Sequence, residues 1–248
     1  MFKDEIGARM KQYEHQVTGW KIDRMLPVYA RIDGRAFSSL TKRMNSPFDY
    51  DMIWLMQQVT FGLVNETRAK IGYTQSDEIN LLWHWNGEDE EAWFGGKIYK
   101  LTSILASLTT SLFHKNLMAA PDPLSYQIED IQDMLPQFDC RVMNLPSEIE
   151  AANMFVWRNL DAQRNAVQKY AQSIFSHREL QGKNVRDILN MIEARNLNYN
   201  EVAVSARHGS WARHDGVYIC PVDFRKMKNR TDFLFRGHVP IYRDDNDA

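Results

Sequence analysis

Apolar and polar positions alternate along the chain with two different periods, which separate predicted helices from predicted strands. Residues 50–70 carry apolar side chains every three or four positions. Residues 97–115 repeat this spacing as one stripe of Ile98 and four leucines. Residues 5–17 form a shorter amphipathic segment. These three segments are predicted to be helices.

Shorter apolar runs bounded by turn residues predict the strands. "PVYARID" (27–33) runs into Asp33–Gly34, and "FDCRVMNLP" (138–146) is a second run of this kind. After Gly72, "YTQSDEINLLWHW" holds two strand-like runs around the polar residues 75–78. This arrangement predicts a hairpin with a carboxylate near its tip.

The remaining segments connect these elements. Residues 38–49, broken by Pro47, are predicted to be a loop, and residues 120–137 an irregular connection. Ser147 is a candidate N-cap for a helix that reaches about residue 177, with room for a break. Residues 184–195 predict a shorter helix, followed by loops and extended segments.

The order β, α, β-hairpin, α, β is that of the ferredoxin-like split βαβ arrangement. It predicts an α+β fold in which an antiparallel sheet carries its crossover helices on one face and leaves the other face available for a substrate. Residues 1–205 would form this domain with helical additions. Residues 206–248 would be a basic C-terminal extension, packed on or tethered to the same domain.

Composition limits the class of protein. The 248 residues suit one large domain, and 44% hydrophobic with 25% charged residues is ordinary for a globular chain. No run of eighteen apolar residues predicts a membrane span, and the charged N-terminal segment lacks the apolar core of a signal peptide. The expected location is cytoplasmic. Cys140 and Cys220 lie in no metal-binding spacing, which argues against structural zinc.

Charge gives only local support for binding nucleic acid. The net charge is −2, so an RNA contact needs a basic patch. Such a patch is predicted between residues 207 and 238, where Trp211 is the one tryptophan proposed to stack on a base. The candidate RNA-binding residues are Arg207, Arg213, Lys226, Lys228 and Arg230. The alternative is an ordinary solvated surface.

Two aspartates carry the candidate chemistry. In a split βαβ sheet, Asp33 ends the first strand beside the hairpin that bears Asp77. Carboxylates and a main-chain carbonyl are hard oxygen ligands, which suit two Mg²⁺ ions that hold a nucleotide's phosphates. Lys97 and Lys100, at a predicted helix start, would add positive charge. Taken alone, Asp33–Gly34 fits an ordinary turn and the lysines fit a surface, so both interpretations stay open.

Five sequence blocks resemble a known family. They are "ARMKQYE", "RIDGRAFSSLTK", "YTQSDEINLL", "FGGKIYKLTSILAS" and "WRNLDAQRNA". Their order and spacing resemble the tRNA-His guanylyltransferase family, and most closely its bacterial-type branch of guanylyltransferase-like 3′-to-5′ polymerases. The similarity spans about residues 5–205.

The resemblance implies a polymerase-palm-type core that adds nucleotides to the 5′ end of tRNA or tRNA-like RNA. ATP first activates a 5′-monophosphate end by adenylylation, and the 3′-hydroxyl of an incoming nucleoside triphosphate, such as GTP, then attacks it. Pairing with the opposite strand can select the nucleotide. Two Mg²⁺ ions, with ATP and GTP as substrates, are therefore expected. A homotetramer or homodimer is the expected assembly.

Site residues follow from the same resemblance. Asp33, Asp77 and Glu78 are the implied catalytic residues. Asp33, the Gly34 carbonyl and Asp77 are the implied metal ligands. The nucleotide and its phosphates would be bound by Arg31, Arg35, Ala36, Phe37, Ser76, Lys97 and Lys100. The activated RNA end would be positioned by Arg158, Asp161 and Asn165.

Three departures from the family pattern redirect these expectations. Gln163, and Ala166 after Asn165, stand where the eukaryotic enzymes have a histidine and paired asparagines, which favours templated 5′-end repair over addition of an unpaired guanosine to tRNA-His. Gly95 and Gly96 replace residues that are often basic, and Ile188 replaces a common lysine.

Two alternatives remain at this stage. A palm-type nucleotide cyclase would use the same fold and metals without RNA. A non-catalytic RNA-binding protein would keep the pocket without the reaction.

Overall fold

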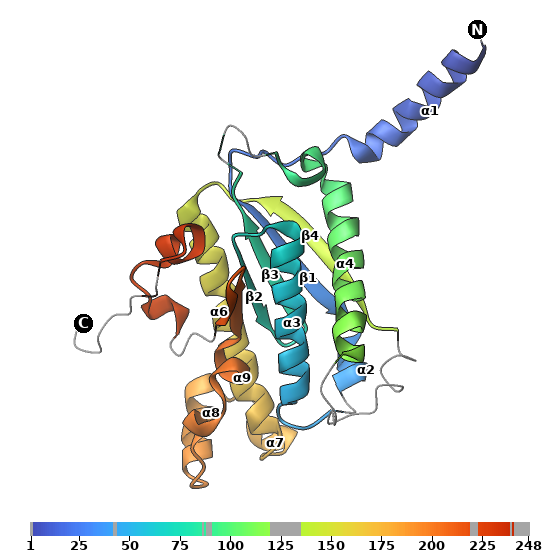
Figure 1. Cartoon of the computed structure of the whole chain (residues 1–248). Coiled ribbons are helices and arrows are strands. Elements are labelled where there is room, and N and C mark those ends of the chain that lie inside the picture. Colours follow the sequence, from blue (N-terminus) through green and yellow to red (C-terminus); the bar gives the residue numbers. More distant parts are fainter. Residues whose placement is uncertain are drawn as a thin grey trace.

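A six-stranded antiparallel sheet forms the centre of the molecule in this computed structural model, which describes residues 2–41, 44–85, 87, 91–119, 135–218, 223–238 and 240. The strand order is β4-β1-β3-β2-β5-β6 (Figure 1). The strands are β1 (Val28–Arg35), β2 (Ile71–Gln75), β3 (Glu78–Trp83), β4 (Gln137–Asn144), β5 (Ser210–Arg213) and β6 (Gly216–Tyr218). The predicted strands and hairpin are confirmed, and β5 and β6 extend the sheet beyond them.

Helices connect the strands in the predicted order. They are α1 (Phe2–Thr18), α2 (Phe37–Thr41), α3 (Tyr50–Thr67), α4 (Ile98–Met118), α6 (Glu148–Gln172), α7 (His177–Leu180), α8 (Val185–Glu193) and α9 (Val204–His208). Short turns of helix lie at Trp93–Gly96, Tyr199–Glu201, Phe224–Lys226 and Asp232–Arg236. The βαββαβ core is thus confirmed. Most of the predicted 120–137 connection lies outside the described residues.

Side-chain caps explain where two of the long helices begin. The Asp49 carboxylate accepts a hydrogen bond from the Met52 amide at 2.9 Å, and the Ser147 hydroxyl accepts one from the Glu150 amide at 3.2 Å. The prediction of Ser147 as an N-cap is confirmed. The predicted 38–49 loop is wrong at its start, where α2 forms because Leu40 is buried in the core.

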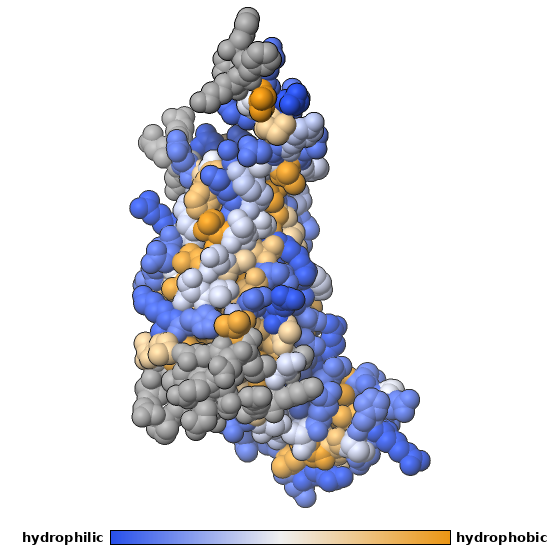
Figure 2. Space-filling model, turned by 90° about the vertical axis from the view of Figure 1, so that its right-hand side faces the viewer, coloured by the Kyte–Doolittle hydropathy of each residue, from blue (hydrophilic) through white to orange (hydrophobic). Residues whose placement is uncertain are grey.

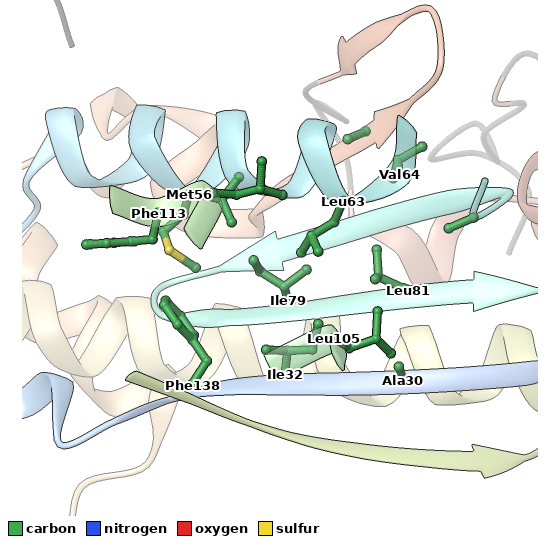
Figure 3. Packing of buried hydrophobic residues seen from close by; sticks show 14 of the residues in the cluster. Ala30, Ile32, Met56, Leu63, Val64, Ile79, Leu81, Leu105, Phe113 and Phe138 are labelled. Atoms are coloured by element: carbon green, nitrogen blue, oxygen red, sulfur yellow. The ribbon is translucent and has the colours of Figure 1, made fainter. Parts of the chain in front are cut away.

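The helices α3 and α4 cover one face of the sheet. Ala30, Ile32, Ile79 and Leu81 point from the strands toward Leu63 and Val64 of α3 and Leu105 and Phe113 of α4, and all eight are buried (Figure 3). Alternate strand residues thus face these two helices, as the pleat of a sheet requires. The expected placement of both crossover helices on one face is confirmed.

The opposite face is not open, contrary to the expectation. Tyr29, Tyr73 and Leu82 on this face pack with Phe155 of α6 and with Phe224 from the C-terminal segment. Large apolar side chains on a strand need a partner layer to exclude water. The substrate cleft must therefore lie at an edge of this layer and not across the sheet face.

Trp211 belongs to this second core, so the prediction that it stacks on a base is wrong. It lies on β5, which pairs with β2, and only 1% of it is exposed. Its ring lies 4.6 Å from the ring of Tyr73 and 5.3 Å from that of Phe155, measured between centroids. Alternation along β5 turns Trp211 inward although charged residues surround it in sequence.

Much of the predicted basic patch stabilises the chain itself. Arg207 donates to the Val202 carbonyl at 2.8 Å, and Arg230 donates to the Met227 carbonyl at 2.8 Å. The Arg213 guanidinium lies 4.5 Å from the ring centroid of Phe233, within cation–π range. Lys226 and Lys228 are exposed. The spacing of charges in the sequence therefore overstates the basic surface.

The N-terminal helix α1 projects from the body of the molecule (Figures 1 and 2). On this helix, Ile6, Met10, Tyr13 and Val17 recur at intervals of four and three residues and are 45–71% exposed. This is the spacing of one apolar helix face. Among the described helices, none is long and apolar enough to cross a membrane.

Gly72 lets α3 approach the sheet closely. A side chain at this position is therefore expected to lower the stability of the protein. Such an atom would lie 2.7 Å from Thr60 Cγ2 and 2.9 Å from Val64 Cγ2, both on α3. We expect Gly72→Ala to lower the free energy of unfolding by about 1–3 kcal/mol, as overpacking does. Urea denaturation measures this, with Gly7→Ala on α1, where a Cβ meets no atom within 4 Å, as the control. An unchanged midpoint for Gly72→Ala would contradict the close packing.

Candidate active site

The hairpin between β2 and β3 places two carboxylates beside the end of β1. Gln75 pairs with Glu78, which leaves Ser76 and Asp77 as the turn. The Gly34 amide of β1 donates to the Asp77 carbonyl at 3.1 Å, and Asp33 lies opposite Glu78 in the ladder. The predicted convergence of Asp33 with the hairpin is therefore present in the fold.

The environment of both aspartates opposes their ionisation. Burial raises the pKa of Asp33, and repulsion from Glu78 adds to this, while Arg31 opposes it from 3.4 Å. Burial also raises the pKa of Asp77, although hydrogen bonds from its own amide and from Ser76 act in the other direction. Asp33 and Asp77 repel each other as well. Two carboxyl groups therefore lie close together at this end of the sheet, and the described protein groups neutralise their negative charge only in part.

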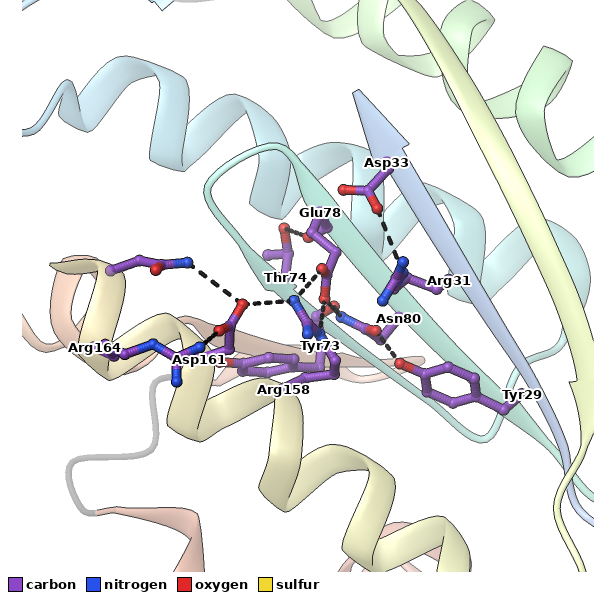
Figure 4. A network of polar contacts seen from close by, with 11 residues as sticks. Tyr29, Arg31, Asp33, Tyr73, Thr74, Glu78, Asn80, Arg158, Asp161 and Arg164 are labelled. Carbon is purple, nitrogen blue, oxygen red and sulfur yellow. Dashed lines mark hydrogen bonds and ion pairs between the residues drawn. The ribbon is translucent and has the colours of Figure 1, made fainter. Parts of the chain in front are cut away.

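Glu78, in contrast, is fully engaged by protein groups. Arg158 of α6 donates Nε to Glu78 Oε1 at 2.7 Å and Nη2 to Oε2 at 2.5 Å, and Asn80 donates to Oε1 at 2.9 Å (Figure 4). The Glu78 and Arg158 side chains are 4% and 7% exposed. A buried two-point pair of this kind fixes both partners in position. Glu78 therefore supports the site and anchors α6 to the hairpin.

Arg158 continues the network along α6. Its Nη2 also donates to Asp161 at 3.0 Å, and Asp161 in turn accepts from Arg164 and, at 3.4 Å, from Asn165 (Figure 4). Arg158, Asp161 and Asn165 follow one another at intervals of three and four residues, so they lie on one side of the helix. The predicted trio Arg158, Asp161 and Asn165 is brought together.

A cleft of about 350 Å³ opens over the carboxylates. Its polar lining includes Arg31, Asp33, Ser76, Asp77, Glu78, Arg158, Asp161, Asn165 and Lys169, and Phe48, Met52 and Ile53 contribute an apolar wall. The volume lies within the range of about 300–1,000 Å³ that is usual for small-ligand sites. Acidic, basic and apolar surfaces thus converge in a space of ligand size.

Among the described residues, no group of three or more histidine, cysteine, aspartate or glutamate side chains is arranged to hold a metal ion. Asp33 and Asp77 are two carboxylates with hard oxygen atoms, and Gly34, whose amide donates to the Asp77 carbonyl, has a main-chain carbonyl oxygen of the same kind. This donor set is of the kind that divalent magnesium prefers, and it is completed by substrate oxygens or water in such sites. The residues present are therefore chemically suited to a divalent cation.

Comparison with known proteins identifies the family. The family model described as tRNAHis guanylyltransferase matches residues 7–146, more than half of the chain. The chain belongs to the tRNAHis guanylyltransferase family. The matched region includes β1, the hairpin and β4, and so contains Asp33, Asp77 and Glu78. Members of this family are nucleotidyltransferases, and this chain is one of them.

Solved structures of the family share the fold. A bacterial tRNAHis guanylyltransferase-like protein in complex with ATP is 32% identical, with a TM-score of 0.74 over 83% of this chain and 85% of that one. A bacterial protein of the same description in complex with GTP is 30% identical, with a TM-score of 0.68 over 84% and 83%. The Saccharomyces cerevisiae enzyme, at 19% identity and TM-score 0.68 over 81% and 91%, supports the fold alone.

One curated relative is a viral protein. An uncharacterized protein of Acanthamoeba polyphaga mimivirus is 28% identical over 225 residues, which cover 84% of this chain and 77% of the viral one.

Several residues assigned from the family lie away from the cleft. Lys97 and Lys100 lie at the start of α4, where the Ile98 amide donates to the carbonyl of Trp20. Trp20 precedes β1 in the chain, whereas Asp33 lies near the end of β1, so the lysines lie at the opposite end of the sheet from Asp33. Within one chain they do not reach the carboxylates. Phe37 is 3% exposed and packs on Phe113 and Phe138, so it is a core residue and not a nucleotide contact.

The remaining residues of that group lie at the end of β1. Arg35 is exposed and donates to Gln137 at 2.9 Å. Ala36 is also exposed and has a φ of 58°, and Ser76 has a φ of 52°. Left-handed backbone at non-glycine residues stores strain, which concentrates at functional sites. Ser76 directly precedes Asp77, and Ala36 lies three residues after Asp33.

Structure also explains a departure from the family pattern. Ile188 on α8 is 3% exposed and packs with Val167 and Ala171 of α6 in a third apolar cluster. A lysine there would bury its charge in this cluster. The position serves the packing of the helical lobe in this chain, so its isoleucine is not a missing surface contact.

One residue of the cleft and one charged neighbour of Asp33 were not predicted from sequence. Asp139 of β4 lies opposite Asp33 and contributes to raising its pKa. Lys169 of α6 lines the cleft and supplies a cation that Lys97 and Lys100 do not. The sequence contains a pattern that could have predicted each of them. In this topology β4 must start beside the end of β1, which places Asp139 near Asp33. Lys169 follows Asp161 and Asn165 at intervals of four residues, which places it on the same side of the helix.

The raised pKa of Asp77 predicts that its charge lowers stability at neutral pH. Below its ordinary value near 3.8 the carboxyl is protonated in both states and costs nothing. As pH rises through the raised folded pKa, stability is lost. We therefore expect Asp77→Asn to have a higher Tm than wild type at pH 7 without divalent cations, with the difference closing below pH 4. A lower Tm for the variant at pH 7 would contradict this.

Proposed function

We propose that this nucleotidyltransferase adds nucleotides in the 3′-to-5′ direction to the 5′ end of tRNA or tRNA-like RNA, under the direction of the opposite strand. The observation that carries this proposal is the pair Asp33 and Asp77, which are held together by the hairpin and lack full neutralisation by protein groups. Asp33 and Asp77 lie in a cleft that also contains Arg31, Arg158 and Lys169. Such a cleft suits a polyphosphate with its counter-ions.

Magnesium is the proposed cofactor, with Asp33, Asp77 and the Gly34 carbonyl as its protein ligands. Burial raises the pKa of Asp77 and repulsion from Asp33 adds to this, so a bound divalent cation that offsets the negative charge is favoured. When bound, magnesium lowers the pKa of an attacking hydroxyl and stabilises the charge of a leaving pyrophosphate. Glu78 holds the turn through Arg158 and keeps the aspartates in place.

ATP and GTP are the proposed substrates. Two bacterial relatives, 32% and 30% identical to this chain, were solved in complex with ATP and with GTP. The similarity covers more than four fifths of each of their chains. In the proposed reaction a 5′-phosphate oxygen of the RNA attacks the α-phosphorus of ATP and releases pyrophosphate. The 3′-hydroxyl of the incoming nucleotide then attacks the RNA phosphate, forming the new bond and releasing AMP. Arg158 and Lys169 stabilise the phosphate charge in both steps.

Templated repair is favoured over addition of an unpaired guanosine by the cleft wall on α6. Ala166 is buried and lines the cleft, whereas Gln163 turns away and donates to Asn159 at 2.7 Å. A methyl group offers no hydrogen bonds that would select guanine. Selection therefore falls to the opposite strand. The exposed stripe on α1 supports the expected homodimer or homotetramer, in which another copy covers it.

The deciding test uses four tRNAs that lack their first 5′ nucleotide and differ only in the base opposite the gap. Each carries a 5′-³²P-monophosphate and is incubated with Mg²⁺, ATP and all four nucleoside triphosphates. We expect one added nucleotide, protected from phosphatase, whose identity follows the opposite base. Guanosine added to all four tRNAs would establish untemplated addition.

Other outcomes point to the alternatives. Unchanged RNA with release of cyclic nucleotide would indicate a cyclase. Unchanged RNA and unchanged nucleotide, with RNA still bound, would indicate a binding protein.

A further inference from the structure

A second cavity, of about 620 Å³, lies on the other side of α6. Two faces of this helix line the two spaces: Asp161 and Asn165 line the catalytic cleft, and Arg164 and Val167 line the second cavity. The far wall comes from α8, from Tyr199 and from Arg207 and His208 of α9. The family site does not account for this space.

One part of the cavity is apolar. Val167 and Ile192 are buried, and Leu189 and Leu197 extend this surface toward the opening. The ring of Tyr199 stands beside them, held edge-on to Tyr170 at 5.4 Å between centroids. A half-buried aromatic ring next to aliphatic side chains provides a surface on which a flat ring can stack.

Two polar atoms in the lining have no hydrogen-bond partner within the described part of the chain. They are the Tyr199 hydroxyl and His208 Nδ1, and both are buried. An unpaired buried polar atom costs about 1–3 kcal/mol, so native structures usually supply a partner from protein, water or ligand. The His208 carbonyl is used differently, since it accepts from Asn159 at 2.9 Å. The main chain at His208 is therefore held by this bond, and the buried ring nitrogen Nδ1 has no partner among the described residues.

The cavity is also lined by three arginines, two of which are paired with carboxylates. Arg164 pairs with Asp161, and Arg225 pairs with Asp223. Arg207 instead contacts neutral acceptors, the Val202 carbonyl at 2.8 Å and Asn200 Oδ1 at 3.3 Å. Its guanidinium lies 5.9 Å from the centre of the Tyr199 ring. Among the described residues lining the cavity, Arg207 is thus the arginine whose contacts are with neutral acceptors, and Glu193 is the carboxylate.

We propose that this second cavity binds one nucleotide unit, with its base against Tyr199 and the aliphatic wall and its phosphate on Arg207. The Tyr199 hydroxyl and His208 Nδ1 would then hydrogen-bond to the base or the sugar. The unit is either a free nucleoside monophosphate or a nucleotide turned out from single-stranded RNA, since both present the same groups. The inference rests on the proposed function only in taking RNA and nucleotides as ligands.

Photocrosslinking locates the ligand without any need for turnover. Wild-type protein is irradiated with 8-azido-AMP in one arm and with single-stranded RNA containing 4-thiouridine in the other, and crosslinked peptides are mapped by mass spectrometry. We expect crosslinks within residues 197–208 in at least one arm. Crosslinks from AMP alone identify a free nucleotide, and crosslinks from RNA alone identify an extruded one. Crosslinks confined to the catalytic cleft in both arms would overturn the proposal.

Variants separate a designed site from incidental contact. We expect Arg207→Gln to reduce crosslinking at 197–208 by about tenfold, because a charge-assisted bond to phosphate is lost. Crosslinking in the catalytic cleft should not change. Arg186→Gln, on the exposed side of α8, is the matched control and should stay within about twofold. Equal loss in both variants would overturn the assignment.

A second variant protects the test against misfolding. Tyr199→Phe removes only the hydroxyl, and we expect it to weaken competition by unlabelled AMP or RNA at 197–208 by about threefold to tenfold. The proposed site would be refuted if Tyr199→Phe left the competition unchanged and Arg207→Gln left crosslinking at 197–208 unchanged. If nucleotide addition fails in the templated assay while crosslinking at 197–208 persists, the proposed reaction falls and the binding site stands.

Discussion

Asp33→Asn is expected to lower the rate of nucleotide addition by at least about a thousandfold while the protein stays folded. The substitution keeps the shape of the side chain and removes one of the two anionic groups proposed to bind magnesium. Loss of a metal ligand forfeits several kcal/mol of transition-state stabilisation, and about 1.4 kcal/mol corresponds to a factor of ten. The measurement is single-turnover addition to a tRNA lacking its first nucleotide.

Asp139→Asn supplies the matched control for this experiment. Asp139 lies directly opposite Asp33 on β4, but its side chain is 56% exposed and does not line the cleft. We expect its rate to stay within about fivefold of wild type, as for other surface charges near a site. If both variants lose activity equally, the rate depends on the total negative charge in this region, and the specific role of Asp33 as a metal ligand is wrong.

Arg158→Met is expected to lower the free energy of unfolding by about 3–5 kcal/mol, because it leaves the buried Glu78 carboxylate without its partner. Asn80 alone would then donate to that carboxylate. Equilibrium urea denaturation at pH 7 measures the loss. Combining Glu78→Gln with Arg158→Met should recover part of it, since the uncompensated charge is gone.

Arg164→Met tests whether the effect belongs to the buried pair. Arg164 shares Asp161 with Arg158 and lies on the same helix, but its side chain is 56% exposed. Exposed ion pairs contribute about 0–1 kcal/mol, so this variant should lie within that range of wild type. A loss of 3 kcal/mol or more in Arg164→Met would instead indicate that the whole chain of ion pairs acts as one unit.

Periodicity and strand order predicted the meeting of Asp33 with Asp77. Both follow from local rules: a strand that ends at Asp33, and a hairpin that brings its turn back beside that end. The same rules also predict where the helix after the hairpin must begin. Because β3 runs away from the turn, α4 starts at the far end of the sheet, and Lys97 could not have joined Asp77 within this chain.

Other features depend on contacts that no local pattern encodes. The use of both Glu78 oxygens by Arg158 joins residues 80 positions apart, and a glutamate next to an aspartate gives no sign of it. The inward direction of Trp211 depends on the pairing of β5 with β2, which a four-residue strand does not announce. Charge counts failed in the tail for a related reason, because Arg213 and Arg230 serve packing and main-chain contacts.

The pairing of β2 with β5 has a consequence for how the molecule is made. Gly72 lies opposite Ala212, so β2 stays an uncovered sheet edge until some 140 further residues have left the ribosome. Contacts this distant in sequence form late, because a long loop must close first. During synthesis the hairpin that carries Asp77 is thus open to pairing with a neighbouring nascent chain. Completion of the C-terminal region, rather than of the catalytic core, ends that exposure.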